Sequence, residues 1–190
     1  VYADMQGMNT KFVHYEKDFT FDINKLLAEI NDDTSLVSLV NPNMPIGNAY
    51  TQDEIRKVLD KAKAHNAMVI VDEAYYLFHK DTSIGLLKEY DNLVILRTFS
   101  KMLSMPGLRI GVVISTAENA QYIRNYKPHY TVNAVALAVA EEMVANYDRV
   151  VKELTEKFEG GKAYLLNALK ETNYSFIPTE GCFICITPKH

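Results

Sequence analysis

The sequence has no tryptophan, only two cysteines and no strong excess of charge of either sign. Its net charge of −4 provides no basic field of the kind that binds nucleic acid or an anionic membrane. The longest apolar runs, such as Met68–Val71 and Gly111–Ile114, are far too short to cross a bilayer. The chain opens Val-Tyr-Ala-Asp-Met, without an initiator methionine or the basic start and apolar block of a signal peptide. We therefore expect a soluble cytoplasmic protein with no nucleic-acid or membrane partner.

The two cysteines, Cys182 and Cys185, form a C-x-x-C pair, a spacing that occurs in redox and metal sites. They lie in a strand-like stretch, where an offset of three places them on opposite faces. There is no second cysteine pair to complete a four-ligand zinc site. We predict that both are buried structural thiols and that the chain has no metal site.

Short apolar runs alternate with longer helical patterns along the chain. Hydrophobic residues make up 48% and charged residues 23%, which is enough apolar material for a sizeable core. The predicted strands cover residues 36–40, 68–71, 93–96 and 111–114. This alternation is typical of an α/β domain with a mostly parallel sheet.

A helix is predicted between the first two strands. Thr51 and Glu54 have the spacing of a capping box. The apolar residues that follow recur at i, i+3, i+4 and i+7: Ile55, Val58, Leu59 and Ala62. Residues 36–71 therefore form a predicted β-α-β unit with parallel strands that are neighbours or nearly so.

The C-terminal part has one long helical pattern, over residues 134–171. Gly160 and Gly161 interrupt it, and we expect a bend there. The helix is predicted to end near Thr172-Asn173, and residues 174–187 to be extended. The long helix is thus interpreted as a bridge out of the first domain.

Charged residues follow two of the predicted strands. Asp72 comes directly after the second strand, and Lys101 follows the third within Arg-Thr-Phe-Ser-Lys. Ligands of open parallel sheets bind outside the carboxyl ends of the strands, so both residues are site candidates. The alternative is structural: the two could pair as a salt bridge or be solvated loop ends.

The combination of residue types matches the needs of pyridoxal-5′-phosphate (PLP) chemistry. PLP forms a Schiff base with a lysine amine, and arginine cannot replace lysine in that role. A carboxylate keeps the pyridine nitrogen protonated, so that the ring can act as an electron sink. Hydroxyls, backbone N–H groups and an arginine hold the phosphate.

The chain resembles the fold-type-I PLP-dependent aminotransferases, in particular the histidinol-phosphate aminotransferase branch. The matching stretches are Asn-Pro-Asn-Met-Pro-Ile-Gly (41–47), Val-Asp-Glu-Ala-Tyr (71–75) and Arg-Thr-Phe-Ser-Lys-Met-Leu-Ser-Met-Pro-Gly-Leu-Arg-Ile-Gly (97–111). The resemblance implies a three-layer α/β/α large domain with a mostly parallel sheet, incomplete here, and the beginning of a small domain. Residues 1–145 would belong to the PLP-binding large domain, and residues 146–190 would be the linking helix and first strand of the small domain.

The resemblance also implies roles for individual residues. Lys101 would form the Schiff base with PLP and shuttle the α-proton of the substrate. Asp72 would pair with the pyridine nitrogen, and Tyr75 would donate a hydrogen bond to the ring oxygen O3′. Asn43 is a further candidate for the cofactor site.

The phosphate of PLP would be held by the motif that surrounds the lysine. By the same resemblance, Thr98, Ser100 and Arg109 would bind it, with Arg109 as a charge-assisted donor. The neighbouring Tyr76 and Arg97 are interpreted as structural, an aromatic shelf and a strand-end charge.

Two departures from the family pattern stand out. Met44 replaces an asparagine that usually donates to O3′, and a thioether has no proton to donate. Family chains are also about twice as long, with a glycine-rich phosphate loop, a stacking aromatic and a carboxylate-binding arginine that this chain lacks. We therefore predict that the isolated 190-residue chain is inactive and binds PLP weakly.

The implied function of the full-length protein is transfer of an amino group between an amino acid or amine and a 2-oxo acid. The resemblance implies a homodimer. One alternative is a PLP-dependent decarboxylase of the threonine-phosphate decarboxylase kind, which shares these motifs. Another is a non-catalytic fragment or degenerate domain that acts as an interaction module, because a site needs its full set of supporting residues.

Overall fold

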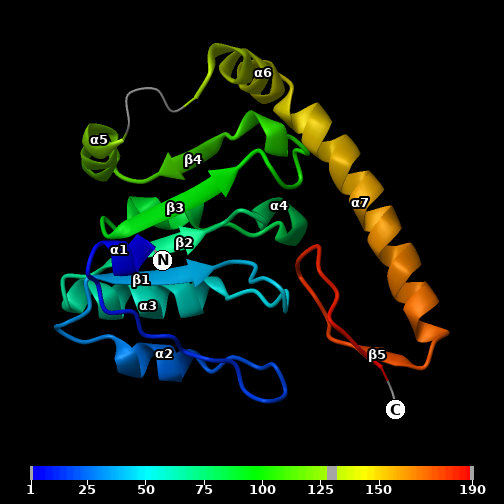
Figure 1. Ribbon diagram of the computed structural model, residues 1–190, viewed down its shortest axis with the longest axis horizontal. Coiled ribbons are helices and arrows are strands. Elements are labelled where there is room, and N and C mark those ends of the chain that lie inside the picture. The colour runs from blue at the N-terminus through cyan, green and yellow to red at the C-terminus, as the bar shows by residue number, and fades with distance from the viewer. Residues whose placement is uncertain (1, 128–131, 189–190) are drawn as a thin grey trace.

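The computed structural model describes residues 2–127 and 132–188, and its larger part is built around one four-stranded sheet (Figure 1). The strands are β1 (Leu36–Val40), β2 (Met68–Asp72), β3 (Leu93–Thr98) and β4 (Gly111–Ile114). They are adjacent in chain order, with β1, β2 and β3 parallel and β4 antiparallel to β3. The prediction of an α/β fold with a mostly parallel sheet is confirmed, and the predicted β-α-β unit joins directly neighbouring strands.

Helices and short 3-10 turns connect and flank these strands. Those around the sheet are α1 (Tyr2–Met5), α2 (Ile23–Glu29), α3 (Gln52–Ala64), α4 (Tyr76–His79), η1 (Ser83–Lys88), η2 (Pro106–Leu108) and α5 (Ala117–Tyr126). The chain then continues through α6 (Ala134–Ala145), α7 (Tyr147–Lys170), β5 (Tyr174–Phe176) and β6 (Ile186–Pro188). Strands β5 and β6 form a separate antiparallel pair.

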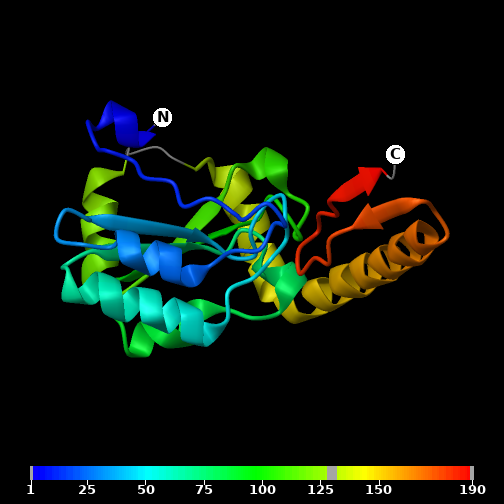
Figure 2. The same ribbon diagram turned by 90° about the horizontal axis from the view of Figure 1, so that it is seen from below.

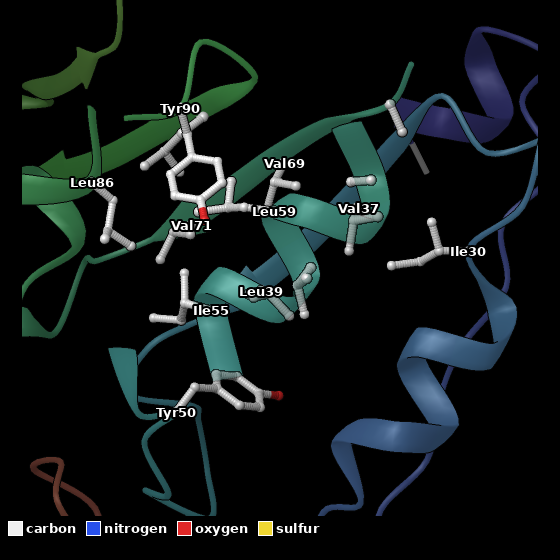
Figure 3. Packing of buried hydrophobic residues seen from close by; sticks show 14 of the residues in the cluster. Ile30, Val37, Leu39, Tyr50, Ile55, Leu59, Val69, Val71, Leu86 and Tyr90 are labelled. Atoms are coloured by element: carbon white, nitrogen blue, oxygen red, sulfur yellow. The ribbon is translucent and has the colours of Figure 1, made fainter. Parts of the chain in front are cut away.

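Helix α3 covers one face of the sheet and forms the main core with it (Figures 2 and 3). The predicted capping box is present, since Thr51 accepts from the Glu54 N–H and the Glu54 side chain accepts from the Thr51 N–H. The four predicted apolar residues of this helix are fully buried: Ile55, Val58, Leu59 and Ala62. They pack on the inward-facing side chains of the strands, among them Val37, Leu39, Val69 and Val71.

The opposite face of the sheet is covered less completely. Along β1, buried and exposed residues alternate, and Leu36 is 43% exposed although it is apolar. On the edge strand β4, Val112 and Val113 point to opposite faces of the sheet and are both exposed. Apolar side chains on this face of β1 and along the edge strand β4 are thus left exposed in the described part of the chain.

The C-terminal helical pattern is divided differently from the prediction. The break falls at Asn146, whose side chain donates to the Glu142 carbonyl at 3.0 Å and ends α6. Gly160 and Gly161 lie within the continuous helix α7, so the predicted interruption of the helix there was wrong. Packing on both sides of the glycines holds the helix: Phe158 meets the Phe78 ring at 4.7 Å, and Lys162 bonds a later loop.

The helix end near residue 171 agrees with the prediction, since α7 ends at Lys170. The extended segment that follows is regular only at its two ends, in β5 and β6. The residues between them form a loop that returns to the large sheet (Figure 1). No helix in the described part of the chain is long and apolar enough to cross a membrane.

Candidate active site

The carboxyl ends of the three parallel strands meet at one edge of the sheet. Val40, the last residue of β1, is paired in register with Asp72 of β2, and Asp72 is paired with Leu96 of β3. The segments that follow these strands therefore begin side by side (Figure 1). The predicted site residues before β4 all lie either at these strand ends or in the segments that follow them.

Asp72 is half-buried at the end of β2. Its carboxylate accepts the backbone N–H of Ala74 at 2.9 Å. Among the described residues, no ion pair links Asp72 to a basic side chain. A half-buried carboxylate in this position retains the capacity to accept a further hydrogen bond from a cationic group.

Lys101 lies in the turn after β3 and is exposed. Its Nζ is 5.1 Å from the centroid of the Tyr75 ring, within the range of a cation–π contact. Within the described ranges Lys101, like Asp72, has no ion-pair partner, so the alternative of a salt bridge between the two is not observed. Both charges are left available for a bound group.

Tyr75 lies between these segments and is only 8% exposed. Its hydroxyl donates to the Sδ of Met44 at 3.5 Å, so the departure from the family pattern contacts a predicted site residue. The Phe183 ring packs edge-on against the Tyr75 ring, with centroids 4.8 Å apart. Tyr75 is thus held from both the β1 side and the C-terminal segment.

The predicted phosphate-binding residues come together through the antiparallel pairing of β3 and β4. Thr98 is paired with Gly111, which brings the chain just before β4 back beside the end of β3. The Thr98 hydroxyl donates to the Ile110 carbonyl at 3.3 Å and accepts the Ser100 N–H at 3.0 Å. Arg109 is exposed at the same turn and donates to the Pro106 carbonyl at 3.1 Å.

The backbone at Arg109 has a left-handed conformation, with φ of 55°. Side chains other than glycine rarely adopt this conformation, and it recurs at binding sites where the surrounding structure imposes it. The pairing of Thr98 with Gly111 supplies that constraint here. Sequence patterns gave no sign of it.

Asn43 lies in the turn after β1, and the structure shows its side chain engaged elsewhere. Burial raises the pKa of Tyr50, and a hydrogen bond from the Asn43 side chain acts in the opposite direction. The Asn43 N–H donates to the Asn48 carbonyl at 2.8 Å. Its proposed role toward a cofactor remains a prediction.

One charged cluster at this edge was not predicted from the sequence. Glu73 is completely buried and forms an ion pair with Arg97, at 2.9 Å to Nη2 and 3.1 Å to Nε. Thr82 donates to the same carboxylate at 2.8 Å, and the Arg97 guanidinium lies 3.8 Å from the Tyr76 ring centroid. The structural interpretation of Tyr76 and Arg97 agrees with this arrangement. An acid after β2 and an arginine on the neighbouring β3 were the available signal.

The prediction of two buried cysteines was wrong. Cys182 is exposed and Cys185 is half-buried, because residues 181–185 form a loop and β6 begins only at Ile186. The Cys185 Sγ donates to the Pro45 carbonyl at 3.2 Å. Partial burial raises the pKa of the Cys182 thiol, and the positive charges of Lys101 and Lys162 nearby offset part of that shift.

These residues fit PLP in chemistry and in place. A lysine and a carboxylate that have no ion-pair partner among the described residues lie at the same sheet edge, and a tyrosine ring lies beside the lysine. Hydroxyls and an arginine gather at the end of β3, as a phosphate requires. No group of three or more potential metal ligands occurs among the described residues.

Comparison with known proteins agrees with this site. The model of the family described as aminotransferase class I and II matches residues 1–189, and the chain belongs to that family. The fold is that of PLP-dependent aminotransferases.

The similar proteins point to one branch of the family. A histidinol-phosphate aminotransferase of Thermotoga neapolitana is 38% identical over 151 residues, which are 80% of this chain and 44% of the relative. Histidinol-phosphate aminotransferase 2 of Pasteurella multocida is 33% identical over 186 residues, which are 95% of this chain and 50% of the relative. The chain thus spans about half the length of the curated relatives it matches.

A solved structure supports the same assignment. Histidinol-phosphate aminotransferase from Sinorhizobium meliloti, in complex with pyridoxal-5′-phosphate, superposes with a TM-score of 0.83 at 26% identity. The match covers 97% of this chain and 50% of that one. The predicted resemblance to the histidinol-phosphate aminotransferase branch is confirmed.

Proposed function

We propose that the full-length protein is a PLP-dependent aminotransferase that moves an amino group between an amino acid, or an amine, and a 2-oxo acid. The observation that carries this proposal is that Asp72 and Lys101 lie at one sheet edge with Tyr75 and have no ion-pair partner among the described residues. If the two residues had a structural role, their charges would be expected to pair in a salt bridge. The family to which the chain belongs supports the same function.

Bound PLP supplies an electron sink for the electron pair left on the substrate when its α-proton is removed. Lys101 holds the cofactor through its Nζ, and in its uncharged form Nζ accepts that proton and later returns it. The carboxylate of Asp72 keeps a proton on the pyridine nitrogen. The Tyr75 hydroxyl donates to the ring oxygen, in place of its hydrogen bond to Met44.

The remaining residues bind and orient. Thr98 and Ser100 offer hydroxyls to the phosphate, and Arg109 offers a guanidinium whose charge suits two phosphate oxygens. Asn43 is retained as a further contact of the cofactor. The division into a large domain, residues 1–145, and the start of a small domain, residues 146–190, is part of the same proposal.

The family resemblance supports a proposal for the assembly and the location of the protein. We infer a homodimer located in the cytoplasm, with amino acids and 2-oxo acids as its small-molecule substrates. Gel filtration of the full-length protein with light scattering measures the assembly. A monomer with full activity would contradict that part of the proposal.

Covalent trapping tests the central assignment. The full-length protein, incubated with PLP and then reduced with borohydride, should carry a pyridoxyl group on the peptide that contains Lys101. Lys101→Arg, which keeps the charge, should lose the label and about 10³-fold or more of the activity. A label on another lysine would contradict the assignment.

A half-reaction separates the transferase from the decarboxylase alternative. With an amino donor alone, a transferase converts bound PLP to its pyridoxamine form and releases a 2-oxo acid. Release of carbon dioxide while the cofactor remains an aldehyde would support the decarboxylase. A full-length protein that binds no PLP would support the non-catalytic alternative.

A further inference from the structure

The loop between β5 and β6 closes back onto the turn that follows β1 (Figures 1 and 2). The Glu180 N–H donates to the Gly47 carbonyl at 2.7 Å, and the Cys185 thiol donates to the Pro45 carbonyl. These contacts join residues more than 130 positions apart (Glu180 and Gly47, Cys185 and Pro45). The C-terminal segment therefore contacts the backbone of the turn directly.

Gly47 makes this close approach possible. An added Cβ at Gly47 would lie 1.9 Å from Thr179 Oγ1 and 2.8 Å from Thr179 Cβ, so no side chain fits there. Its φ of +82° is also a conformation that favours glycine. On the loop side, the Thr179 hydroxyl accepts the Gly181 N–H at 3.0 Å, which fixes the threonine against the glycine.

Lys162 binds the Thr179–Gly181 loop through two hydrogen bonds. Its Nζ, on α7, donates to the Thr179 carbonyl at 2.9 Å and to the Gly181 carbonyl at 3.3 Å. In the described part of the chain Lys162 has no ion pair, and its Nζ also lies 5.7 Å from the centroid of the Phe158 ring. Its charge is thus used on two loop carbonyls that flank the Glu180 amide in sequence.

The clamped turn carries residues of the candidate site. Asn43 and Met44 lie within it, and the Gly47 N–H donates to the Asn43 carbonyl at 2.9 Å. Met44 in turn accepts from the Tyr75 hydroxyl. A shift of Gly47 would therefore be passed to the residues next to the proposed position of the cofactor ring.

We propose that Lys162 is a positioning residue that fixes the Thr179–Gly181 loop on Gly47 and thereby keeps the Asn43–Gly47 turn in the geometry that binds PLP. The inference rests on the proposed function. Without the ammonium, two half-buried carbonyls lose a charge-assisted donor, which weakens the loop contact more than loss of a neutral hydrogen bond would.

Hydrogen exchange tests the clamp without the cofactor. In the full-length PLP-free protein, Lys162→Met should speed exchange about 5- to 10-fold in peptides covering residues 43–48 and 177–185. Peptides from α3 should exchange as in the wild type, which shows that the fold is intact. Lys157→Met, an exposed lysine of the same helix, is the matched control and should change neither peptide. Unchanged exchange in Lys162→Met would overturn the inference.

Cofactor affinity tests the link to PLP. Lys162→Met should raise the dissociation constant of PLP about 5- to 10-fold, while Lys162→Arg, which can also donate to two carbonyls, should remain within about 2-fold of the wild type. Gly47→Ala disrupts the same contact on the side of the turn, because the added methyl group would clash with Thr179. It should therefore give both the faster hydrogen exchange and the weaker binding of PLP.

The two proposals fail in different ways. A wild-type protein that binds no PLP on Lys101 contradicts the proposed function. A wild type that does bind it, with Lys162→Met and Gly47→Ala unchanged in affinity, contradicts only the positioning role of Lys162.

Discussion

Two clusters of charged residues lie at the same edge of the sheet and differ in whether their charges are paired with each other. The paired corner consists of Glu73, Arg97 and Thr82, and the open corner of Asp72, Lys101 and Tyr75. In the paired corner, a fully buried carboxylate is bonded by a guanidinium and a hydroxyl. In the open corner, the carboxylate accepts one backbone N–H, and the ammonium lies 5.1 Å from the centroid of an aromatic ring.

Asp72 and Glu73 are consecutive residues, so the difference comes from the alternation of side chains at the strand end. Glu73 points into the interior, where a charge without a partner would be very costly. Asp72 points to the other face and is half-buried, so its carboxylate can still accept a hydrogen bond from a ligand. The comparison separates charges that hold the fold from charges to which the proposed function assigns a chemical role.

The largest effect is expected in the paired corner. Glu73→Ala leaves the largely buried Arg97 without its carboxylate, which should lower the free energy of unfolding by about 3–5 kcal/mol. Urea denaturation of the full-length PLP-free protein measures this. Glu89→Ala removes a carboxylate that pairs with Arg56 on the surface and should have a far smaller effect. Equal losses of unfolding free energy in the two variants would contradict a structural role for the buried Glu73–Arg97 pair.

The opposite pattern is expected for Asp72→Asn. Because Asp72 has no ion-pair partner among the described residues, the free energy of unfolding should change by no more than about 0.5 kcal/mol. The amide cannot hold the proton on the pyridine nitrogen, so transferase activity should fall about 10- to 100-fold, as for loss of one hydrogen bond to a charged group. A variant that is destabilised but fully active would place Asp72 with the structural charges.

A smaller effect is expected at Met44, which contacts the open corner through Tyr75. A donor to the ring oxygen withdraws negative charge that stabilises the protonated nitrogen of the link between Lys101 and PLP. Met44→Asn would add such a donor, so the pH midpoint of the visible absorbance band should fall by about 1 unit. Met44→Leu adds none and serves as the control. A midpoint that is unchanged or higher in the asparagine variant would show that residue 44 does not face the ring oxygen.

The smallest effect concerns Cys182, at the rim of the open corner. Partial burial raises the pKa of its thiol despite the nearby Lys101 and Lys162 charges. The thiolate is the reactive form, so alkylation near neutral pH should be several-fold slower than for a free cysteine and should accelerate as the pH rises. Cys182→Ser removes this thiol alone and provides the background rate, to which Cys185 contributes. Alkylation as fast as that of a free thiol would contradict the raised pKa.

Much of the fold could be predicted because its signals are local. The capping box at Thr51 and the apolar spacing of α3 defined a helix that the structure reproduces, and the four strands fall where short apolar runs predicted them. The motif around Lys101 placed the candidate site, because parallel strands bring their carboxyl ends together.

The failures concern contacts that are distant in sequence. Gly160 and Gly161 remain helical because Phe158 and Lys162 on either side are held by partners far along the chain. The cysteines were assigned to a buried strand, yet their loop is drawn toward Gly47 and Pro45. The Glu73–Arg97 pair needs the register of β2 and β3, which no single segment specifies.

The length of α7 has a mechanical consequence. With 24 residues and a rise of about 1.5 Å per residue, the helix is a rod about 36 Å long that begins directly after the break at Asn146. A tilt of about 5° at that break would move Lys162, about 22 Å along the helix, by about 2 Å, which is most of the length of the 2.7 Å hydrogen bond between Glu180 and Gly47. A small rotation at the N-terminus of α7 would therefore be enough to separate the C-terminal loop from the turn that follows β1.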